Sequence, residues 1–357
     1  MRVSPPSEGP GSFIPAGYWR LSLPGGGSLL SHRRSAAITV ILLLVAVGIG
    51  CVTLTTGSYD ISVARVIEIL SGGQEGTDAY LVLNQRLPRV VAALLIGMCL
   101  AASGVIFQTL SSNALGSPDL IGFTTGATTG GLMVIILLGR SGGNVLMIGT
   151  FLGGLATATA VLLIARAGAG TGERLVVGGI AVAAMLSSVN DYLVSRADLE
   201  TAEAARVWQH GSLNVISWRN VIPLMVGAAV GIPLAAGAGR ALRYLELGED
   251  VAVGVGLPLR RVQLGLSILG VAMAALAVAT GGPIGFVALA APQLARRLAR
   301  APSVAMLPAM AMGAALLACS DLIAQRVLSP FQIPVGLVTG ALGGLYLVIV
   351  LLGRRRD

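Results

Sequence analysis

Apolar stretches about as long as a membrane-spanning helix recur along the chain from residue 36 onward, separated by short polar or glycine-rich segments. A hydrocarbon core about 30 Å thick needs roughly 17–25 helical residues to cross it. In lipid each such segment must satisfy its own backbone hydrogen bonds, which favours α-helix. We therefore expect an all-α polytopic membrane protein with about ten transmembrane helices, over residues 36–54, 88–108, 114–138, 144–165, 175–195, 221–240, 262–280, 286–298, 304–322 and 334–352.

One predicted span is much shorter than the others. It covers residues 286–298, contains Pro292, and ends in the sequence RRLAR at residues 296–300. A helix of this length is too short to cross a bilayer comfortably, so we expect neighbouring helices to shelter it. Arginine accumulates on the cytoplasmic side of membranes, and these arginines therefore predict that the span ends there.

The distribution of arginine predicts an orientation for the whole chain. With both termini in the cytoplasm, the inner segments hold 16 of the 24 arginines and the outer segments hold the other eight. Arg86, Arg89 and Arg326 belong to the outer group, against the usual bias, and so call for a specific reason. Ten spans also divide into two halves of five, which permits an inverted repeat, although the two halves show no clear sequence similarity.

The first 35 residues differ from the rest of the chain. They are rich in Pro, Gly and Ser and end in SHRRS, so we predict a disordered cytoplasmic N-terminal tail over residues 1–35. Residues 36–357 then form one transmembrane domain. The apolar run 36–54 is long and is followed by no clear A-x-A cleavage site, so it is interpreted as the first span rather than a signal peptide.

Composition excludes a water-soluble protein. Hydrophobic residues make up 55% of the chain and charged residues only 11%, whereas soluble domains have roughly 25% charged residues. The net charge of +8 comes from arginines in short loops between apolar runs, which fits membrane orientation better than a nucleic-acid surface. No nucleic-acid partner is expected.

The basic residues also limit the chemistry. All 24 are arginine, so the chain has no Walker A lysine, and any ATP must bind to another chain. The cysteines Cys51, Cys99 and Cys319 lie in or beside apolar runs without a C-x-x-C pair, which is typical of packing residues. The two histidines are far apart in sequence. No catalytic residue and no metal site are expected.

Four stretches, in this order, carry a resemblance. They are the R-L-P-R opening with its A-x-x-G-x-x-x-Q segment and N-A-L-G-S-P turn at 86–127, VWQHGSLNVISW at 207–218, LELGEDVAVGVGLPL at 245–259, and GGPIGFVALAAPQ at 281–293 with the segment 320–352. Together they resemble the FecCD-type permeases, the membrane subunits of bacterial importers for iron–siderophores, haem and cobalamin. The chain departs from the family pattern at Ala114, Val255 and Gln293, where proline, leucine and histidine are usual.

The resemblance implies a type II ABC importer permease fold over residues 36–357, in the bacterial plasma (inner) membrane. It implies a second permease chain, either another copy or a homologous one, together with two ATP-binding subunits and an extracytoplasmic solute-binding protein. Membrane lipid surrounds the spans. No cofactor is expected on this chain itself, because the partner subunits hold the ATP.

The loop between the sixth and seventh spans is the expected coupling loop to the ATPase. Seen alone it is an ordinary acidic loop, and only the resemblance gives it this role. Its carboxylates favour the start of a short helix, and its small residues permit close packing. The residues concerned are Leu247, Gly248, Glu249, Asp250, Ala252, Gly254 and Gly256.

The resemblance gives the three outer arginines a role as well. Arg86, Arg89 and Arg326 are expected to receive acidic residues of the solute-binding protein. The alternative is that they are ordinary interfacial arginines, which either extend their charged groups to the membrane interface or pair with acidic residues of this chain, such as Asp321.

Polar residues gather toward the outer end of the fifth span. Such residues in a membrane face either a cavity or a neighbouring helix, so both helix packing and a solute path remain open. The candidates are Ser187, Ser188, Asn190 and Asp191.

We therefore predict a permease subunit of an ATP-driven importer. Ferric siderophores are the favoured cargo, with haem and cobalamin as alternatives. An ion-coupled secondary transporter is less favoured, because it needs acidic groups at mid-membrane and Asp191 is the single ambiguous one. A membrane enzyme needs a convergent polar cluster, which the sequence does not offer.

Overall fold

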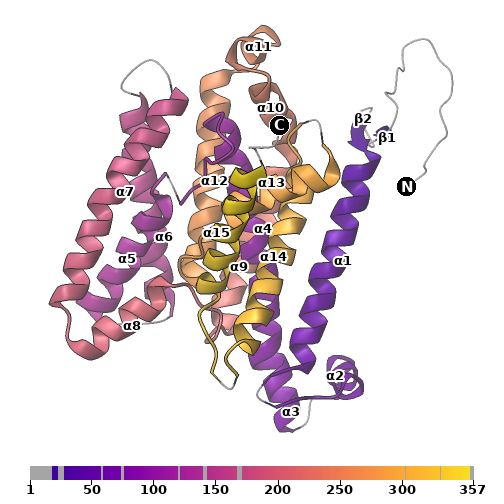
Figure 1. The fold of residues 1–357 in the computed structure, drawn as a ribbon, viewed down its shortest axis with the longest axis vertical. Helices are drawn as coiled ribbons and strands as arrows, with labels where there is room; N and C mark the ends of the chain where they lie inside the picture. Colours follow the sequence, from indigo (N-terminus) through magenta and orange to yellow (C-terminus); the bar gives the residue numbers. More distant parts are fainter. Residues whose placement is uncertain are drawn as a thin grey trace.

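The apolar stretches fold into long helices that stand side by side in a computed structural model of the chain (Figure 1). The structure describes residues 18–22, 28–57, 59–73, 76–119, 121–139, 143–166, 171–301, 303–329 and 331–353. The predicted spans correspond in order to α1 (Arg33–Thr55), α4 (Leu87–Leu110), α5 (Phe123–Leu138), α6 (Asn144–Arg166), α7 (Thr171–Arg196), α9 (Trp218–Gly237), α12 (Leu259–Gly281), α13 (Val287–Ala299), α14 (Met306–Arg326) and α15 (Val335–Gly353).

By length and composition, seven helical segments among the described residues can cross a membrane, and shorter apolar helices lie at 123–138 and 335–349. The short eighth span is also helical, as the sequence predicted, and its 13 residues form α13. The prediction of a nearly all-helical, polytopic protein is confirmed.

Short helices mark the two ends of the bundle. α10 (Gly239–Glu246) and α11 (Glu249–Gly254) lie at one end, here called the α11 end. The opposite end, called the α2 end, carries α2 (Val63–Leu70), α3 (Thr77–Tyr80) and α8 (Leu199–Gln209) (Figure 1). α3 continues through the π-helix η1 (Leu81–Arg86) into α4, so that one helical segment of 34 residues runs from Thr77 to Leu110.

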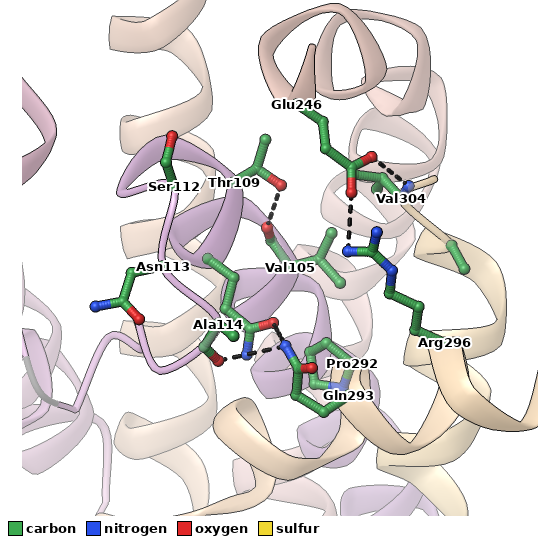
Figure 2. A pocket seen from close by; sticks show the side chains of 12 residues that line it. Val105, Thr109, Ser112, Asn113, Ala114, Glu246, Pro292, Gln293, Arg296 and Val304 are labelled. Atoms are coloured by element: carbon green, nitrogen blue, oxygen red, sulfur yellow. Dashed lines mark hydrogen bonds and ion pairs between the residues drawn. The ribbon is translucent and has the colours of Figure 1, made fainter. Parts of the chain in front are cut away.

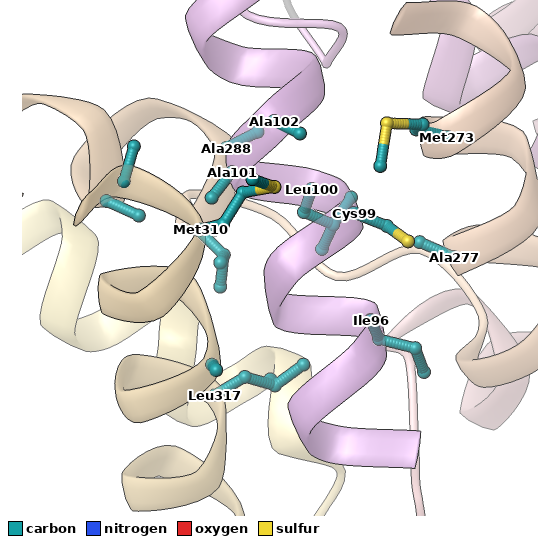
Figure 3. Packing of buried hydrophobic residues seen from close by; sticks show 14 of the residues in the cluster. Ile96, Cys99, Leu100, Ala101, Ala102, Met273, Ala277, Ala288, Met310 and Leu317 are labelled. Atoms are coloured by element: carbon teal, nitrogen blue, oxygen red, sulfur yellow. The ribbon is translucent and has the colours of Figure 1, made fainter. Parts of the chain in front are cut away.

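α4 is the central helix of the bundle. It packs against α14, α12, α13 and α9, while α1 covers the outer side of α14. Side chains of α4, α12, α13 and α14 meet in one apolar core (Figure 3). Gly97 of α4 and Gly313 of α14 face each other where the two backbones cross, and a Cβ on either would collide with the other's carbonyl. Small residues thus set the close approach of these helices.

A second group of helices lies beside this core. α5 packs against α6 and α7, and α12 contacts α6 as well as α4, so that α12 joins the two groups. The aromatic rings of Phe107 on α4 and Phe123 on α5 pack with their centroids 4.9 Å apart. This arrangement leaves a space between α5, α7, α15 and the segment before α13 that is described below.

Two predictions need correction or comment. The third span was predicted to begin at residue 114, but the described residues from 114 to 122 are turns, and α5 begins at Phe123. Pro118 and the left-handed Gly122 (φ 83°) explain this, because neither continues a helix. In the predicted tail, residues 1–17 and 23–27 lie outside the described residues, and β1 (Tyr18–Ser22) pairs antiparallel with β2 (Ser28–His32), where the sequence predicted disorder.

Candidate functional site

The predicted coupling loop forms the tip of the α11 end (Figure 1). Gly248 ends the turn after α10 with φ 109°, a conformation that glycine adopts without the steric cost of a side chain. Glu249 and Asp250 occupy the first turn of α11, where carboxylates interact favourably with the helix dipole. Glu249 also accepts a hydrogen bond of 2.8 Å from Gln263 on α12.

Some side chains of this loop are buried and others are exposed. Ala252 is fully buried, so it holds α11 onto the rest of the chain and is not free to contact a partner. Leu247 is 67% exposed, and Val251, Val253 and Val255 are exposed too. Exposed apolar side chains outside the membrane spans indicate a protein contact. Of these, the prediction named Leu247 and missed the three valines.

A small polar pocket lies beside this loop, between the ends of α4, α10 and α13 (Figure 2). Gln293 donates hydrogen bonds to Gln108 Oε1 (2.8 Å) and to the carbonyl of Ala114 (3.3 Å). Two of the three departures from the family pattern, Ala114 and Gln293, are therefore in contact with each other. An acidic residue, Glu246, and Arg296 line the same pocket.

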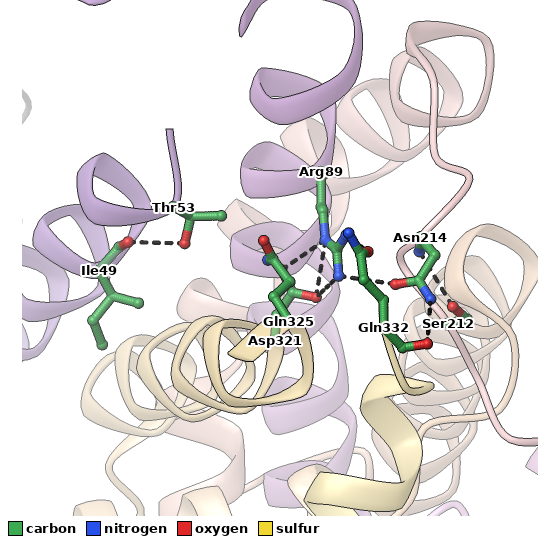
Figure 4. A network of polar contacts seen from close by, with 8 residues as sticks. All are labelled: Ile49, Thr53, Arg89, Ser212, Asn214, Asp321, Gln325 and Gln332. Carbon is green, nitrogen blue, oxygen red and sulfur yellow. Dashed lines mark hydrogen bonds and ion pairs between the residues drawn. The ribbon is translucent and has the colours of Figure 1, made fainter. Parts of the chain in front are cut away.

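Arg89 is buried, with only 8% of its surface exposed. Its Nη2 lies 2.8 Å from Asp321 Oδ1 on α14, and its Nη1 donates to Gln332 Oε1 at 2.7 Å (Figure 4). A further hydrogen bond of 2.9 Å reaches Asn214, and Gln325 donates to Asp321. The alternative from the sequence, pairing with Asp321, is what the structure shows, and in this conformation Arg89 is not presented to a partner.

The other two arginines lie at the α2 end. Arg86 is half-buried and donates to the carbonyl oxygens of Leu54 (2.7 Å) and Tyr59, so it holds the linker between α1 and α2. Arg326 is exposed and lies 4.0 Å from the exposed Asp60. Arg326 is therefore the predicted docking arginine whose side chain is most open to a partner.

The polar residues of α7 face a second pocket, of about 380 Å³. Ser187, Asn190 and Asp191 line it, because positions i, i+3 and i+4 share one face of a helix. Ser188 does not line it, and its hydroxyl donates to the carbonyl of Ala184. We call this space the α7 pocket.

Its other walls come from the start of α5, the end of α8, the segment before α13 and the start of α15. Asp119 accepts a 2.5 Å hydrogen bond from Thr124, which ties the turn before α5 to that helix. Phe286, in a left-handed conformation (φ 67°), and Gly340 complete the lining. The sequence missed these residues because they come from separate segments of the chain.

Among the described residues, no group of three or more His, Cys, Asp or Glu side chains is arranged to hold a metal ion. The three cysteines are free thiols. The side chains of Arg86, Arg89 and Gln293 are engaged in hydrogen bonds within the protein. In the α7 pocket, the buried Oδ1 of Asn190 has no hydrogen-bond partner among the described residues.

Comparison with known proteins agrees with this description. The FecCD transport family matches residues 40–353. The chain is 39% identical to the ferric enterobactin transport system permease protein FepG of Escherichia coli (strain K12), over 90% of this chain and 98% of that protein. It is 34% identical to the hemin transport system permease protein HmuU of Yersinia pestis, over 77% of this chain and 84% of that protein.

A solved structure shares the fold. A metal-chelate type ABC transporter in an inward-facing conformation superposes with a TM-score of 0.80 and 26% identity, covering 89% of this chain and 99% of that one. The predicted importer permease fold is thereby confirmed.

Proposed function

The chain belongs to the FecCD transport family, and on that premise we propose that it is the membrane permease subunit of an ATP-driven importer for a ferric siderophore. Similarity to siderophore permeases supports the cargo. FepG carries ferric enterobactin in its name, and a second relative, at 32% identity, is an achromobactin transport system permease protein of Dickeya dadantii (strain 3937). Haem is the second candidate, on the 34% identity to HmuU.

The observation that carries the ATP-driven mechanism is the α11 loop. It stands outside the spans, is fixed by Ala252, and exposes Leu247 with three valines. We infer that a cleft of a separate ATPase subunit receives this loop, which places the α11 end in the cytoplasm, as the arginine distribution predicts. Closure of the ATPases around ATP then moves the loop and the helices attached to it.

The α2 end then faces outward and receives the solute-binding protein. Arg326 is the primary docking residue in this proposal, because its guanidinium is exposed. Arg86 contributes at the edge of that surface while it holds the α1–α2 linker. Arg89 has a structural role in the conformation seen here.

The α7 pocket contributes to the cargo path in this proposal. Its lining combines hydroxyl, amide and carboxyl groups with backbone at Gly285, Gly336 and Gly340. A second permease chain, either a copy or a homologue, supplies the other side of the path. Residues 36–357 act as one permease domain.

The experiment is reconstitution of the permease with its ATPase and binding subunits in proteoliposomes. ATP-dependent uptake of one labelled cargo, tested among ferric siderophores, haem and cobalamin, is the expected result. Uptake without an ATPase subunit, driven by an ion gradient, would show a secondary transporter instead. Uptake of haem or cobalamin but of no siderophore would show that the proposed cargo is wrong, while the proposed function as an importer would stand.

A further inference from the structure

A single carboxylate anchors the end of α10 to two other segments. Glu246 is the last residue of α10, directly before the α11 loop. Its Oε1 lies 2.9 Å from Nη1 of Arg296 on α13, and its Oε2 accepts a 2.8 Å hydrogen bond from the backbone N–H of Val304 (Figure 2). Both oxygens are therefore engaged by the segments that form the end of α13 and the approach to α14.

The contact of Glu246 with Arg296 and Val304 fixes the relative position of these segments more specifically than apolar packing does. Hydrogen bonds to ionised groups are shorter and roughly twice as strong as neutral ones, and they fix the relative position of their partners. α11 packs against α10 and α12, so the loop and α10 form one unit at the α11 end. Displacement of that unit acts directly on Arg296 and on Val304.

α13 joins this contact to the α7 pocket. The helix has 13 residues and is therefore about 20 Å long at 1.5 Å per residue. Near one end, Gln293 and Arg296 line the pocket beside Glu246. Beyond the other end, Phe286 lines the α7 pocket. The short helix thus connects the two pockets that flank it.

Between these ends, α13 touches α4 through its backbone. Pro292 has no N–H to donate to the carbonyl of Ala288, four residues earlier. That carbonyl lies against Gly104 of α4, where a Cβ would collide with it. Gln108 of α4 donates a 3.1 Å hydrogen bond to the next carbonyl, that of Leu289. This contact holds the part of α13 near Phe286 against α4, and the ion pair with Glu246 holds the part near Arg296.

We propose that Glu246 is a positioning residue for transport. It passes movement of the α11 loop through Arg296 to α13 and through Val304 to the segment before α14, and α13 shifts Phe286 at the wall of the α7 pocket. This inference rests on the proposed function, because it takes the α11 loop as the part that the ATPase moves. It also gives the short span a role, since a helix that stops within the bundle places its first residues at the pocket.

The test uses the reconstituted complex and measures cargo transported per ATP hydrolysed. Glu246→Gln keeps the size of the side chain and an acceptor for Val304 but removes the charge that pairs with Arg296. We expect transport per ATP to fall by roughly tenfold, within the usual 5–150-fold range of coupling between sites. ATP hydrolysis itself is expected to continue. Arg296→Gln should have the same effect, and Arg296→Lys, which keeps a positive charge, should recover part of the ratio.

A matched control lies at the opposite end of the bundle. Glu68→Gln also removes a carboxylate from an ion pair with an arginine, Arg65, at 2.8 Å. Measured with the solute-binding protein at saturating concentration, so that any effect on docking at the α2 end is removed, this variant should keep the wild-type ratio. A second readout follows α13 directly: Phe286→Cys, with Cys51 and Cys319 replaced by Ser, should change its rate of thiol labelling when ATP is added. Glu246→Gln should abolish that change.

The outcomes separate the two proposals. If the wild-type complex fails to couple transport to ATP, the proposed function is wrong. If the wild type transports while Glu246→Gln and Arg296→Gln both keep the normal ratio and the labelling change, the positioning role is wrong and the importer stands. If Glu246→Gln fails to assemble, Arg296→Gln decides alone, because the Arg296 side chain is half exposed and its replacement removes little packing.

Discussion

Arg89 on α4 and Asp321 on α14 form an ion pair, 2.8 Å between Nη2 and Oδ1, inside the bundle near the α2 end. Gln332, Asn214 and Gln325 complete the hydrogen bonds of the two charged groups. The pair therefore fixes α4 and α14 to the segments before α9 and α15. Its burial makes the loss of one partner costly, because the remaining charge is left without compensation.

Arg89→Met and Asp321→Leu are each expected to lower the free energy of unfolding by about 3–5 kcal/mol. The double variant should lose much less free energy of unfolding than the two single variants together, because it leaves no unpaired charge. Thermal unfolding of the purified permease in detergent measures this. The ion pair between the partly exposed Arg65 and the exposed Glu68 is the control, where removal of either partner should change the unfolding temperature little. Additive losses at Arg89 and Asp321 would contradict the assignment.

The exposed face of the α11 loop predicts how the ATPase binds. Val251→Glu with Val253→Glu places charge at apolar side chains that are exposed in the free permease. We expect the amount of co-purified ATPase subunit to fall by at least about tenfold, which corresponds to roughly 1.4 kcal/mol. Val63→Glu, at a valine of similar exposure on α2, should leave co-purification unchanged. Normal assembly of the double variant would rule out this face.

Arg326 gives the cleanest test of docking at the α2 end. Arg326→Glu should weaken binding of the solute-binding protein by charge repulsion, by about 1.4- to fivefold for an exposed pair worth about 0.2–1 kcal/mol. Added salt should weaken the wild-type complex as well, because the Debye length is only about 8 Å at physiological ionic strength. A binding titration at two salt concentrations measures both effects. Equal affinity of variant and wild type would exclude Arg326 from the interface.

Two adjacent serines of α7 differ in their position, because Ser187 lines the α7 pocket and Ser188 does not. Ser187→Phe fills a position that lines the pocket, whereas Ser188→Phe adds the same volume at an exposed position outside it. If cargo passes here, the first variant should reduce uptake severalfold and the second should not, with equal amounts of permease in the membrane. Equal uptake by the two variants would favour helix packing as the role of this polar cluster.

The crossing of α4 and α14 predicts a strong effect of small volume changes. Gly313→Val places a side chain against the Gly97 carbonyl, with backbone and not a flexible side chain as its neighbour. We expect the free energy of unfolding to fall by about 1–3 kcal/mol, which is typical of overpacking. Gly344→Val on α15, where nothing lies within 4 Å of an added Cβ, is the control. Unfolding temperatures of the two variants compare them directly.

Sequence patterns predicted the membrane helices because apolar length is a local property. The span 286–298 became α13 almost residue for residue, since Phe286 and Arg300 on either side adopt left-handed conformations that end the helix. The span 114–138 was predicted too long, because its first nine residues are apolar enough but contain Pro118 and the left-handed Gly122. Hydropathy does not register such breaks.

The candidate site was predictable in part. Motif resemblance located the α11 loop, but not which of its side chains face outward, since Ala252 turned inward and the valines outward. The partners of Arg89 come from positions 214, 321 and 332, and only tertiary structure brings these together. The spacing of Ser187, Asn190 and Asp191 did contain the signal of a shared helix face, which separates them from Ser188.

The π-helical turn η1, between α3 and α4, behaves like a one-residue insertion in an otherwise regular helix. Each residue advances an α-helix by about 100°, because a turn holds 3.6 residues. Because the wider π turn takes up the extra residue, deleting one residue from Leu81–Arg86 would restore regular helix and leave α2 and Arg65 in nearly the same orientation relative to α4. The α2 end therefore tolerates the loss of one codon at η1, whereas the loss of one codon within the regular helix of α4 would rotate the α2 end by about 100° relative to the rest of α4.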